Sequence, residues 1–187
     1  DQPFNFDYGV LICNGEIYNY KQLLFENNII AHTSSDCEII IHLYKKYGIS
    51  DMLEMLDGVF AFALYDKLKE ELYIARDVYG VRPLFYGYQE KCKDYKSVPM
   101  FAFSSEMKQI NNLQTDEGKL CISQFPCSTY YKYKCINNNF YYIMSDKYAQ
   151  FGLYSYTYDY NLLLSENIYL DMIRNQLTSA VIKRVDN

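Results

Sequence analysis

The feature that most limits the possible folds is a pair of neighbouring segments with no polar face. Val59-Phe60-Ala61-Phe62-Ala63-Leu64-Tyr65 is hydrophobic throughout, and Leu72-Tyr73-Ile74-Ala75 follows after a charged turn at residues 66–70. This pattern predicts a β-hairpin, and the short connection makes its strands antiparallel. A sheet that is apolar on both faces must be covered on both, by helices or by a second sheet.

Periodic patterns on either side of the hairpin predict more strands and helices. Expected strands cover residues 10–13, 83–88 and 100–103, and expected helices cover residues 21–25, 36–47, 51–56 and 165–187. Asn19 with Gln22, and Ser35 with Glu38, have the spacing of helix-capping boxes. Polar residues 89–98 indicate a loop, and the tyrosine-rich stretch 111–161 indicates irregular hairpins. The predicted fold class is α+β, with no domain boundary in the pattern.

Composition restricts the class of protein more than its activity. At 187 residues the chain is long enough for one domain with a substantial core, and its net charge of −5 disfavours nucleic acid or an anionic membrane as the main partner. No apolar run is long enough to span a bilayer, and no signal peptide is recognised in a chain that begins without Met. The six cysteines contain no CxxC pair and form no zinc pattern with His32 and His42. We therefore expect reduced thiols, no metal site and a cytoplasmic location.

The candidate binding residues surround Asn14-Gly15, where the apolar run Leu11-Ile12-Cys13 stops. An amide side chain beside a free backbone N–H, at the end of a buried strand, can form a pair of oxyanion donors, and Glu16 can hold a cationic group. Taken alone, Asn-Gly is more typical of a hairpin turn, and Glu16 of a solvated surface acid. The chain after Glu16 leads to a helix start instead of a second strand, which favours the site.

Other charged positions have structural explanations of their own. Asp36 lies in the first turn of an expected helix, where a carboxylate favours the helix dipole without any ligand. Arg76-Asp77 before Gly80 is expected to form an ion-paired turn that positions the strands. The two histidines allow no Ser-His-Asp arrangement, and no P-loop, GxGxxG or HExxH motif occurs. A nucleotide site within this chain is therefore not expected.

Several segments, taken in order, resemble one known family, the glutaminase domain of glutamine-hydrolysing asparagine synthetases. The resemblance spans residues 9–108 and continues more loosely to residue 185. It rests on Leu11-Ile12-Cys13-Asn14-Gly15-Glu16-Ile17-Tyr18-Asn19, Ser35-Asp36-Cys37-Glu38, residues 57–66, Ala75-Arg76-Asp77, Gly80, Pro83-Leu84, Tyr86-Gly87 and residues 103–108. Phe125-Pro126 resembles the family's Phe-Pro turn, although Cys127-Ser128 departs from the usual small residues there.

The resemblance implies a class II glutamine amidotransferase of the N-terminal-nucleophile hydrolase type, folded as a four-layer α/β/β/α sandwich. In that family an N-terminal cysteine attacks the side-chain amide of glutamine, its own α-amine acts as the base, and a thioester forms as ammonia leaves. By resemblance, Asn14 and the Gly15 N–H stabilise the oxyanion, while Glu16 and Asp36 hold the α-ammonium of glutamine. Ammonia then passes to a second domain, which activates aspartate with ATP.

Parts of the family pattern lie outside this sequence. The nucleophilic cysteine, the first strand, the family's Arg-His-Arg-Gly segment and its Arg-Leu-Ser segment, whose arginine binds the substrate carboxylate, would all precede Asp1. The chain alone is therefore expected to be inactive. Cys13 cannot replace the nucleophile, because it lies inside a strand and has no free α-amine. Residues 165–187 resemble the helix before the synthetase domain, which would hold ATP and Mg²⁺, whereas this domain is expected to need no cofactor. The expected partners are glutamine, that synthetase domain and a second copy in a homodimer.

Two other interpretations stay open. The pattern Arg-Asp-x-x-Gly-x-Arg-Pro-Leu, from Arg76 to Leu84, also occurs in other class II amidotransferases such as the phosphoribosylamine-forming enzyme. Glu16-Ile17-Tyr18-Asn19 and residues 104–108 favour the asparagine synthetases instead. A degenerate module of the same fold without catalytic activity is the alternative from a different functional class. Sequence beyond the two ends of the chain would distinguish these interpretations.

Overall fold

A computed structural model describes residues 2–89, 102–113, 120–149 and 166–185. The chain divides into two compact units, residues 1–149 and residues 150–187. Residues 90–98 of the expected loop, and residues 114–119 and 150–161 of the tyrosine-rich stretch, lie outside the described residues. The first unit contains all of the predicted site residues.

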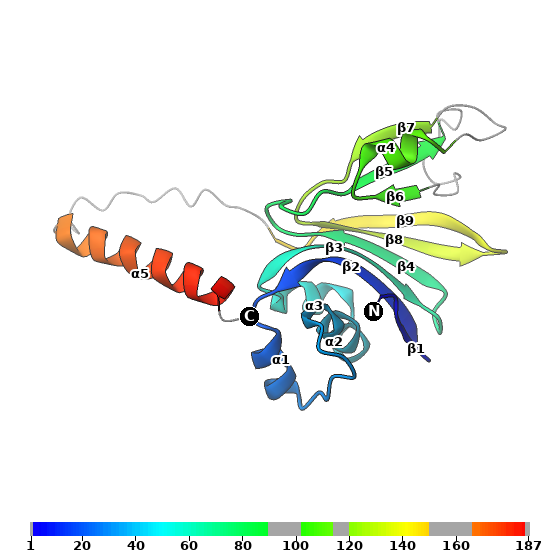
Figure 1. Cartoon of the computed structure of the whole chain (residues 1–187). Coiled ribbons are helices and arrows are strands. Elements are labelled where there is room, and N and C mark those ends of the chain that lie inside the picture. The colour runs from blue at the N-terminus through cyan, green and yellow to red at the C-terminus, as the bar shows by residue number, and fades with distance from the viewer. Residues whose placement is uncertain (1, 90–101, 114–119, 150–165, 186–187) are drawn as a thin grey trace. The chain divides into compact units, whose positions relative to one another are not determined.

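The first unit is built on a six-stranded antiparallel sheet with the order β1-β2-β3-β4-β8-β9. Its strands are β1 (Phe4–Phe6), β2 (Gly9–Ile17), β3 (Gly58–Asp66), β4 (Glu71–Arg76), β8 (Thr129–Ile136) and β9 (Asn139–Lys147). β3 and β4 are the predicted hairpin, and they lie at the centre of the sheet (Figure 1). The central position agrees with their lack of a polar face.

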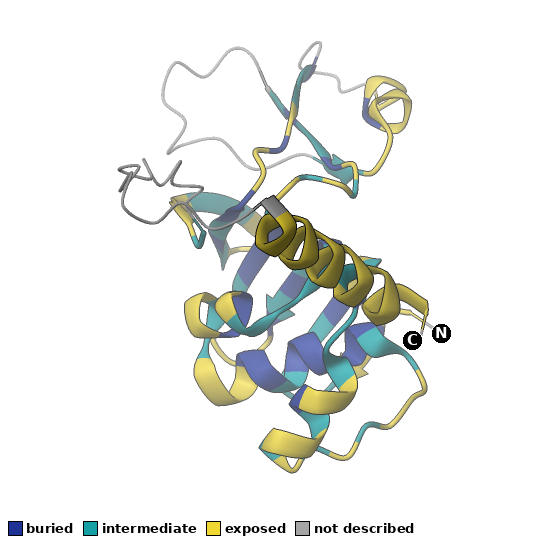
Figure 2. Cartoon of the chain, turned by 90° about the vertical axis from the view of Figure 1, so that its left-hand side faces the viewer, coloured by how far each residue is buried: buried dark blue, intermediate teal, exposed yellow. Residues whose placement is uncertain are grey.

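Helices cover one face of this sheet. They are α1 (Tyr20–Asn27), the 3₁₀ helix η1 (Asp36–Glu38), α2 (Ile39–Tyr47) and α3 (Ile49–Met55). The apolar stripe of α2 meets Leu11, Phe60 and Leu64 of the sheet in the larger hydrophobic core. Figure 2 shows buried residues on the sides where these helices and the sheet meet. Burial of this stripe accounts for the helical period of residues 37–47.

A second, three-stranded antiparallel sheet covers the other face. Its order is β6-β5-β7, with β5 at Phe85–Gln89, β6 at Ala102–Ser104 and β7 at Leu120–Gln124. Ala61 and Ile74 of the large sheet share a core with Leu84 and Phe125. The short helix α4 (Met107–Asn111) lies against β5, where a side chain at Gly87 would come within 3.0 Å of Ile110. The expectation that both faces of the β3–β4 hairpin are covered is therefore confirmed.

The tyrosine-rich stretch is more regular than predicted. β8 and β9 form a long hairpin, and β4 pairs along its full length with residues 129–134 of β8. Asn137 and Asn138 both have positive φ angles, +51° and +64°, as the two central residues of a type I′ turn require. Asparagine tolerates this conformation, so these two residues form the turn of a regular hairpin.

Both predicted capping boxes are wrong. Neither Asn19 nor Ser35 makes a side-chain cap hydrogen bond. Asn19 instead donates to the Met55 carbonyl at 2.9 Å and accepts from the Asp57 N–H at 3.0 Å, so it ties the start of β3 to the end of β2. Glu38 turns away from Ser35 and accepts hydrogen bonds from residues 32 and 33. The side chains of Asn19 and Glu38 therefore bond to groups outside their own helices instead of capping them.

The second unit contains helix α5 (Glu166–Val185). Its larger apolar residues Leu170, Ile173, Leu177 and Val181 are exposed. Residues 165, 186 and 187 of the expected helix lie outside the described residues. Among the residues that the structure describes, no helix is long and apolar enough to cross a membrane.

Candidate functional site

Asn14 and Gly15 lie inside a strand, so the hairpin-turn interpretation of Asn-Gly is wrong. β2 continues to Ile17, and Gly15 stands opposite Phe60 of β3. A side chain at Gly15 would come within 3.0 Å of the Val59 carbonyl and the Phe60 backbone. Glycine is therefore required here by the close approach of β2 to β3.

The register of β2 directs the Gly15 N–H away from β3. Backbone N–H groups alternate between the two sides of an antiparallel strand. On the side away from β3, the Cys13 N–H donates to Gln2 Oε1 at 2.7 Å, and the Ile17 N–H donates to Asp36 Oδ2 at 2.6 Å. The Gly15 N–H lies between these two and points the same way, beyond the last residue that β1 pairs, Leu11. The structure thus brings a backbone donor to the open edge of β2.

Asn14 points to the opposite face from the helices, because side chains alternate along a strand and Cys13 is in the helical core. Its side chain is exposed and lines a cavity of about 240 Å³. This cavity lies between the two sheets and is lined by Gln2, Ile12, Cys13, Asn14, Ala61, Phe62, Ala63, Ile74, Pro83, Leu84, Phe103, Ser104 and Ser105. A small polar ligand in it would meet the Asn14 amide.

Asp36 lies on η1, which docks against the end of β2. The Cys37 thiol donates to the Gly15 carbonyl at 3.6 Å, and Asp36 Oδ2 accepts from Ile17. One carboxylate oxygen of Asp36 is thus held by backbone. Asp36 therefore has a partner in β2, and its carboxylate is more than a helix-dipole acid.

Glu16 is half-buried on the same strand face as Asn14, opposite Val59. In the described part of the chain, no hydrogen bond or ion pair joins Glu16 to Asp36. The structure thus brings Asn14, the Gly15 N–H and Asp36 together around the end of β2. Glu16 lies beside them without a direct link to Asp36.

Cys13, the cysteine nearest to Asn14 in sequence, is a poor nucleophile. Its side chain is buried in the helical core. The hydrogen bond with the Cys37 thiol raises the pKa of the Cys13 thiol well above its ordinary value, and burial of the side chain raises it further. Because the thiolate is the reactive form, this thiol is held in its inert state at neutral pH.

Arg76 and Asp77 position the loop between β4 and β5, as predicted, but not as an ion pair. The buried Arg76 guanidinium donates to three carbonyls, those of Gly80 at 2.6 Å, Arg82 at 2.7 Å and Phe125 at 2.7 Å. The Asp77 carboxylate is fully buried and accepts from the backbone N–H groups of Val81 at 2.9 Å, Tyr79 at 3.0 Å, Arg82 at 3.0 Å and Phe60 at 3.3 Å. This loop carries Pro83 and Leu84 to the cavity wall.

Two features of the described region were missed from the sequence. The Gln2 amide donates to the Cys13 carbonyl and accepts from its N–H, both at 2.7 Å, and so extends the sheet edge beyond β1. No local pattern around Gln2 predicts this. His32, Glu38 and His42 form a cluster whose ligand atoms all lie within 4.8 Å of one another, which could hold a metal ion. The i,i+4 spacing of Glu38 and His42 was its only sequence signal.

Comparison with known proteins relates this geometry to a family. A family model described as a glutamine amidotransferase domain matches residues 1–152. The chain is 44% identical over 115 residues to a probable glutamine-hydrolyzing asparagine synthetase of Acanthamoeba polyphaga mimivirus, covering 60% of this chain and 20% of that protein. It is 47% identical over 105 residues to a putative glutamine-hydrolyzing asparagine synthetase of Methanocaldococcus jannaschii, covering 55% of this chain and 17% of that protein. The chain thus spans a fifth or less of the length of these relatives.

Solved structures share the fold at low sequence identity. The glutamine phosphoribosylpyrophosphate (PRPP) amidotransferase of B. subtilis has a TM-score of 0.56 and 22% identity, over 80% of this chain and 31% of that chain. An allosteric regulatory enzyme of purine biosynthesis has a TM-score of 0.58 and 23% identity, with the same coverage. This likeness extends to the mixed α+β architecture with two antiparallel sheets.

Proposed function

Because the chain belongs to the glutamine amidotransferase domain family, we propose that it is the part of an asparagine synthetase that hydrolyses glutamine. The observation that carries the proposal is the pair of donors at the end of β2. Asn14 presents a side-chain amide to the cavity, and the next residue directs its N–H to the open edge of the same strand. The resemblance to asparagine synthetases over more than half of the chain supports the choice among amidotransferases.

In the proposed reaction the side-chain carbonyl of glutamine accepts hydrogen bonds from Asn14 Nδ2 and the Gly15 N–H. A cysteine thiolate forms a bond to the carbonyl carbon, and the negative charge that develops on oxygen is stabilised by these two donors. The tetrahedral intermediate collapses to a thioester as ammonia leaves with a proton. Water then hydrolyses the thioester and releases glutamate.

The α-ammonium of glutamine is proposed to bind Glu16 and Asp36. Asp36 Oδ2 is already occupied by the Ile17 N–H at 2.6 Å, which fixes the carboxylate and leaves Oδ1 for the ligand. A carboxylate that is oriented before binding loses little conformational freedom when the ammonium arrives. Charge-assisted hydrogen bonds of this type favour glutamine over ligands that lack the α-amine.

The attacking thiol is proposed to be an N-terminal cysteine outside these 187 residues. The properties of Cys13 support this, since burial and its bond to Cys37 keep it protonated. A further part of the same protein would use ATP and Mg²⁺ to amidate aspartate with the ammonia. The complete fold is proposed to be the four-layer α/β/β/α sandwich of N-terminal-nucleophile hydrolases, with α4 belonging to the outer helical layer.

The proposal is tested by Asn14→Ala in the complete protein that contains this chain. Asparagine synthesis is measured with aspartate, ATP and either glutamine or ammonium as the nitrogen source. Loss of one oxyanion donor should lower the glutamine-dependent rate by ~10²-fold or more, while the ammonia-dependent rate is retained. Asn5→Ala, which removes an exposed asparagine side chain on β1 outside the cavity lining, is the matched control and should keep both rates. Equal loss of both activities in Asn14→Ala would contradict the assignment of Asn14.

Another class II amidotransferase is the second candidate, because one of the solved structures that share this fold is a glutamine PRPP amidotransferase. The same preparation supplied with glutamine and PRPP instead of aspartate and ATP separates the two. Phosphoribosylamine formation would favour that candidate over the synthetase. Absence of glutamine hydrolysis in the complete protein under both conditions would favour a non-catalytic module.

A further inference from the structure

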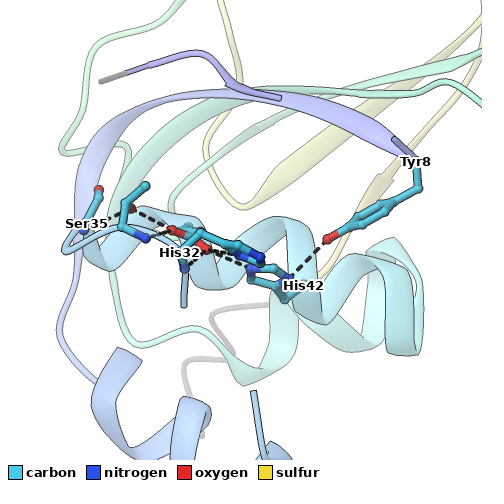
Figure 3. Close-up of polar contacts among 6 residues, drawn as sticks. Tyr8, His32, Ser35 and His42 are labelled. Carbon is cyan, nitrogen blue, oxygen red and sulfur yellow. Dashed lines mark hydrogen bonds and ion pairs between the residues drawn. The ribbon is translucent and has the colours of Figure 1, made fainter. Parts of the chain in front are cut away.

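His32, Glu38 and His42 form a compact polar cluster on the helical side of the large sheet. Glu38 and His42 belong to η1 and α2, and His32 belongs to the segment that precedes them. Figure 3 shows His32 and His42 next to each other, with Tyr8 reaching His42 from the side of β2. The amidotransferase chemistry proposed above uses none of these side chains, so the cluster has no assigned role.

The three side chains present one ligand atom each to a common point. Glu38 Oε1 lies 2.9 Å from His42 Nε2 and 3.2 Å from His32 Nδ1. Ligand atoms that bind one metal ion at about 2.0–2.2 Å lie roughly 3.0–3.5 Å from one another. The two distances from Glu38 Oε1 are therefore near the separation that a shared ion requires. The two imidazole nitrogens lie within 4.8 Å of each other, so side-chain rotations would complete the arrangement.

The charge of the cluster favours a cation. The Glu38 side chain is 1% exposed, and within the described ranges its ion-pair partners are His32 and His42, with no lysine or arginine. Buried carboxylates are usually paired with a cation or bound to a metal. This one has two imidazoles instead.

Residues around the cluster hold Glu38 and the two imidazole rings in place. Side chains that hydrogen-bond to metal ligands have the same effect in known metal sites. Thr33 occupies Glu38 Oε2 through its N–H at 2.7 Å and its hydroxyl at 2.6 Å. Oε1 accepts the backbone N–H of His32 at 2.7 Å and faces both imidazole rings. Tyr8 Oη lies 3.0 Å from His42 Nδ1, and Phe6 packs edge-on against both imidazole rings. A second partner on the far ring nitrogen fixes the ring and the nitrogen that binds the metal.

A hydrogen-bonded core pair would explain Glu38 and His42 alone. It would not explain His32, whose side chain is 68% exposed and yet stacks on His42 with ring centroids 5.8 Å apart. His32 supplies a third ligand that solvent can reach, so an ion can enter without unfolding the core. Two imidazole nitrogens and one carboxylate oxygen are a donor set that suits Zn²⁺ and related transition metals.

We propose that His32, Glu38 and His42 bind one divalent transition-metal ion of the Zn²⁺ class, with solvent completing its coordination. When the ion binds His42 Nε2, the proton of that ring resides on Nδ1 and is donated to Tyr8 Oη. The ion joins residues 32 and 33 to α2 and thereby secures the segment that leads to Asp36. The site is independent of the proposed amidotransferase activity and does not take part in its chemistry.

Isothermal titration of the purified protein with Zn²⁺ alone tests the proposal, because both histidines of the chain lie in this cluster. We expect one ion per chain, and at least ~10-fold weaker binding in His32→Gln. His32 is largely exposed, so this variant should retain the fold, which circular dichroism verifies. Glu54→Gln, which removes an exposed carboxylate on α3, is the matched control and should bind like the unmodified chain.

Titration with Co²⁺ distinguishes this site from binding by thiols. Coordination by nitrogen and oxygen should give weak visible bands without the intense near-ultraviolet band of a cobalt–thiolate bond. A thiolate band, equal affinity in His32→Gln, or no stoichiometric binding would each overturn the metal site. None of these outcomes bears on glutamine hydrolysis, so the two proposals fail separately.

Discussion

Replacement of Asp36 by asparagine separates the structural role of this residue from its proposed role in binding glutamine. Asp36 Oδ2 accepts a hydrogen bond from the Ile17 N–H at 2.6 Å. The carbonyl oxygen of asparagine can accept the same bond, so we expect Asp36→Asn to lower the free energy of unfolding by less than about 1 kcal/mol. The amide nitrogen then occupies the Oδ1 position and presents a donor to the α-ammonium of glutamine.

The expected loss is one charge-assisted hydrogen bond, which contributes about 1.5–3 kcal/mol. At about 1.4 kcal/mol per factor of ten, kcat/KM for glutamine should fall roughly 10- to 150-fold. The ammonia-dependent rate should not change, because ammonia bypasses the glutamine site. Asp51→Asn, an exposed carboxylate in the first turn of α3, is the control and should leave both rates unaltered.

Glutaramate, which is glutamine without its α-amine, provides a second readout. If Asp36 holds the ammonium, the preference of the enzyme for glutamine over glutaramate should shrink in Asp36→Asn by the same factor as kcat/KM falls. An unchanged preference, with a folded protein and a normal ammonia-dependent rate, would refute the assignment of Asp36 to substrate binding.

Two further predictions concern the stability of the fold. Asp77→Ala leaves four backbone N–H groups, including the buried one of Phe60, without their acceptor. We expect a loss of about 4 kcal/mol in the free energy of unfolding and a Tm lower by about 8–16 °C. Asp7→Ala, which removes an exposed carboxylate, should have little effect. A Tm within 2 °C, on the order of 1 kcal/mol or less, would contradict the role of Asp77 as the organiser of its loop. Burial raises the pKa of Asp66, but hydrogen bonds from Tyr44, Lys69 and Leu68 hold this pKa below its ordinary value of 3.8. Ionised Asp66 therefore stabilises the folded state above pH 3.8, and this stabilisation is lost as the pH falls through the lower pKa of the folded state. In acid denaturation, Asp66→Asn should flatten the decline in stability below pH 3.8, and a profile parallel to that of the unmodified chain would show that Asp66 is not responsible.

Most of the fold could be predicted from local pattern. The β3–β4 hairpin, the helical stripe of α2 and the antiparallel connections all follow from which residues are apolar and how often they recur. Burial of apolar surface dominates the free energy of folding, and the spacing of apolar residues can be read directly from the sequence. The resemblance to a glutaminase domain likewise rested on several short segments that occur in a fixed order along the chain. Such segments can be recognised without a structure.

Polar partners were predicted less well, because they depend on which distant segments meet. Asn19 and Ser35 have the spacing of helix caps, yet Asn19 bonds across 36 residues to Met55 and Glu38 turns to His32 and His42. A hydrogen bond forms wherever a partner of the right geometry is brought close. Local spacing alone therefore cannot rank these alternatives.

The sequence by itself determined that apolar strands lie between two covering layers, and that Asn14, Gly15, Glu16 and Asp36 are the residues to examine. Only the tertiary structure decided the direction of the Gly15 N–H, the docking of Asp36 on Ile17 and the meeting of His32 with Glu38 and His42. Hydrophobic pattern is a property of neighbours along the chain. Strand register and the approach of separate segments are set by packing of the whole unit, and the chemistry of a site depends on them.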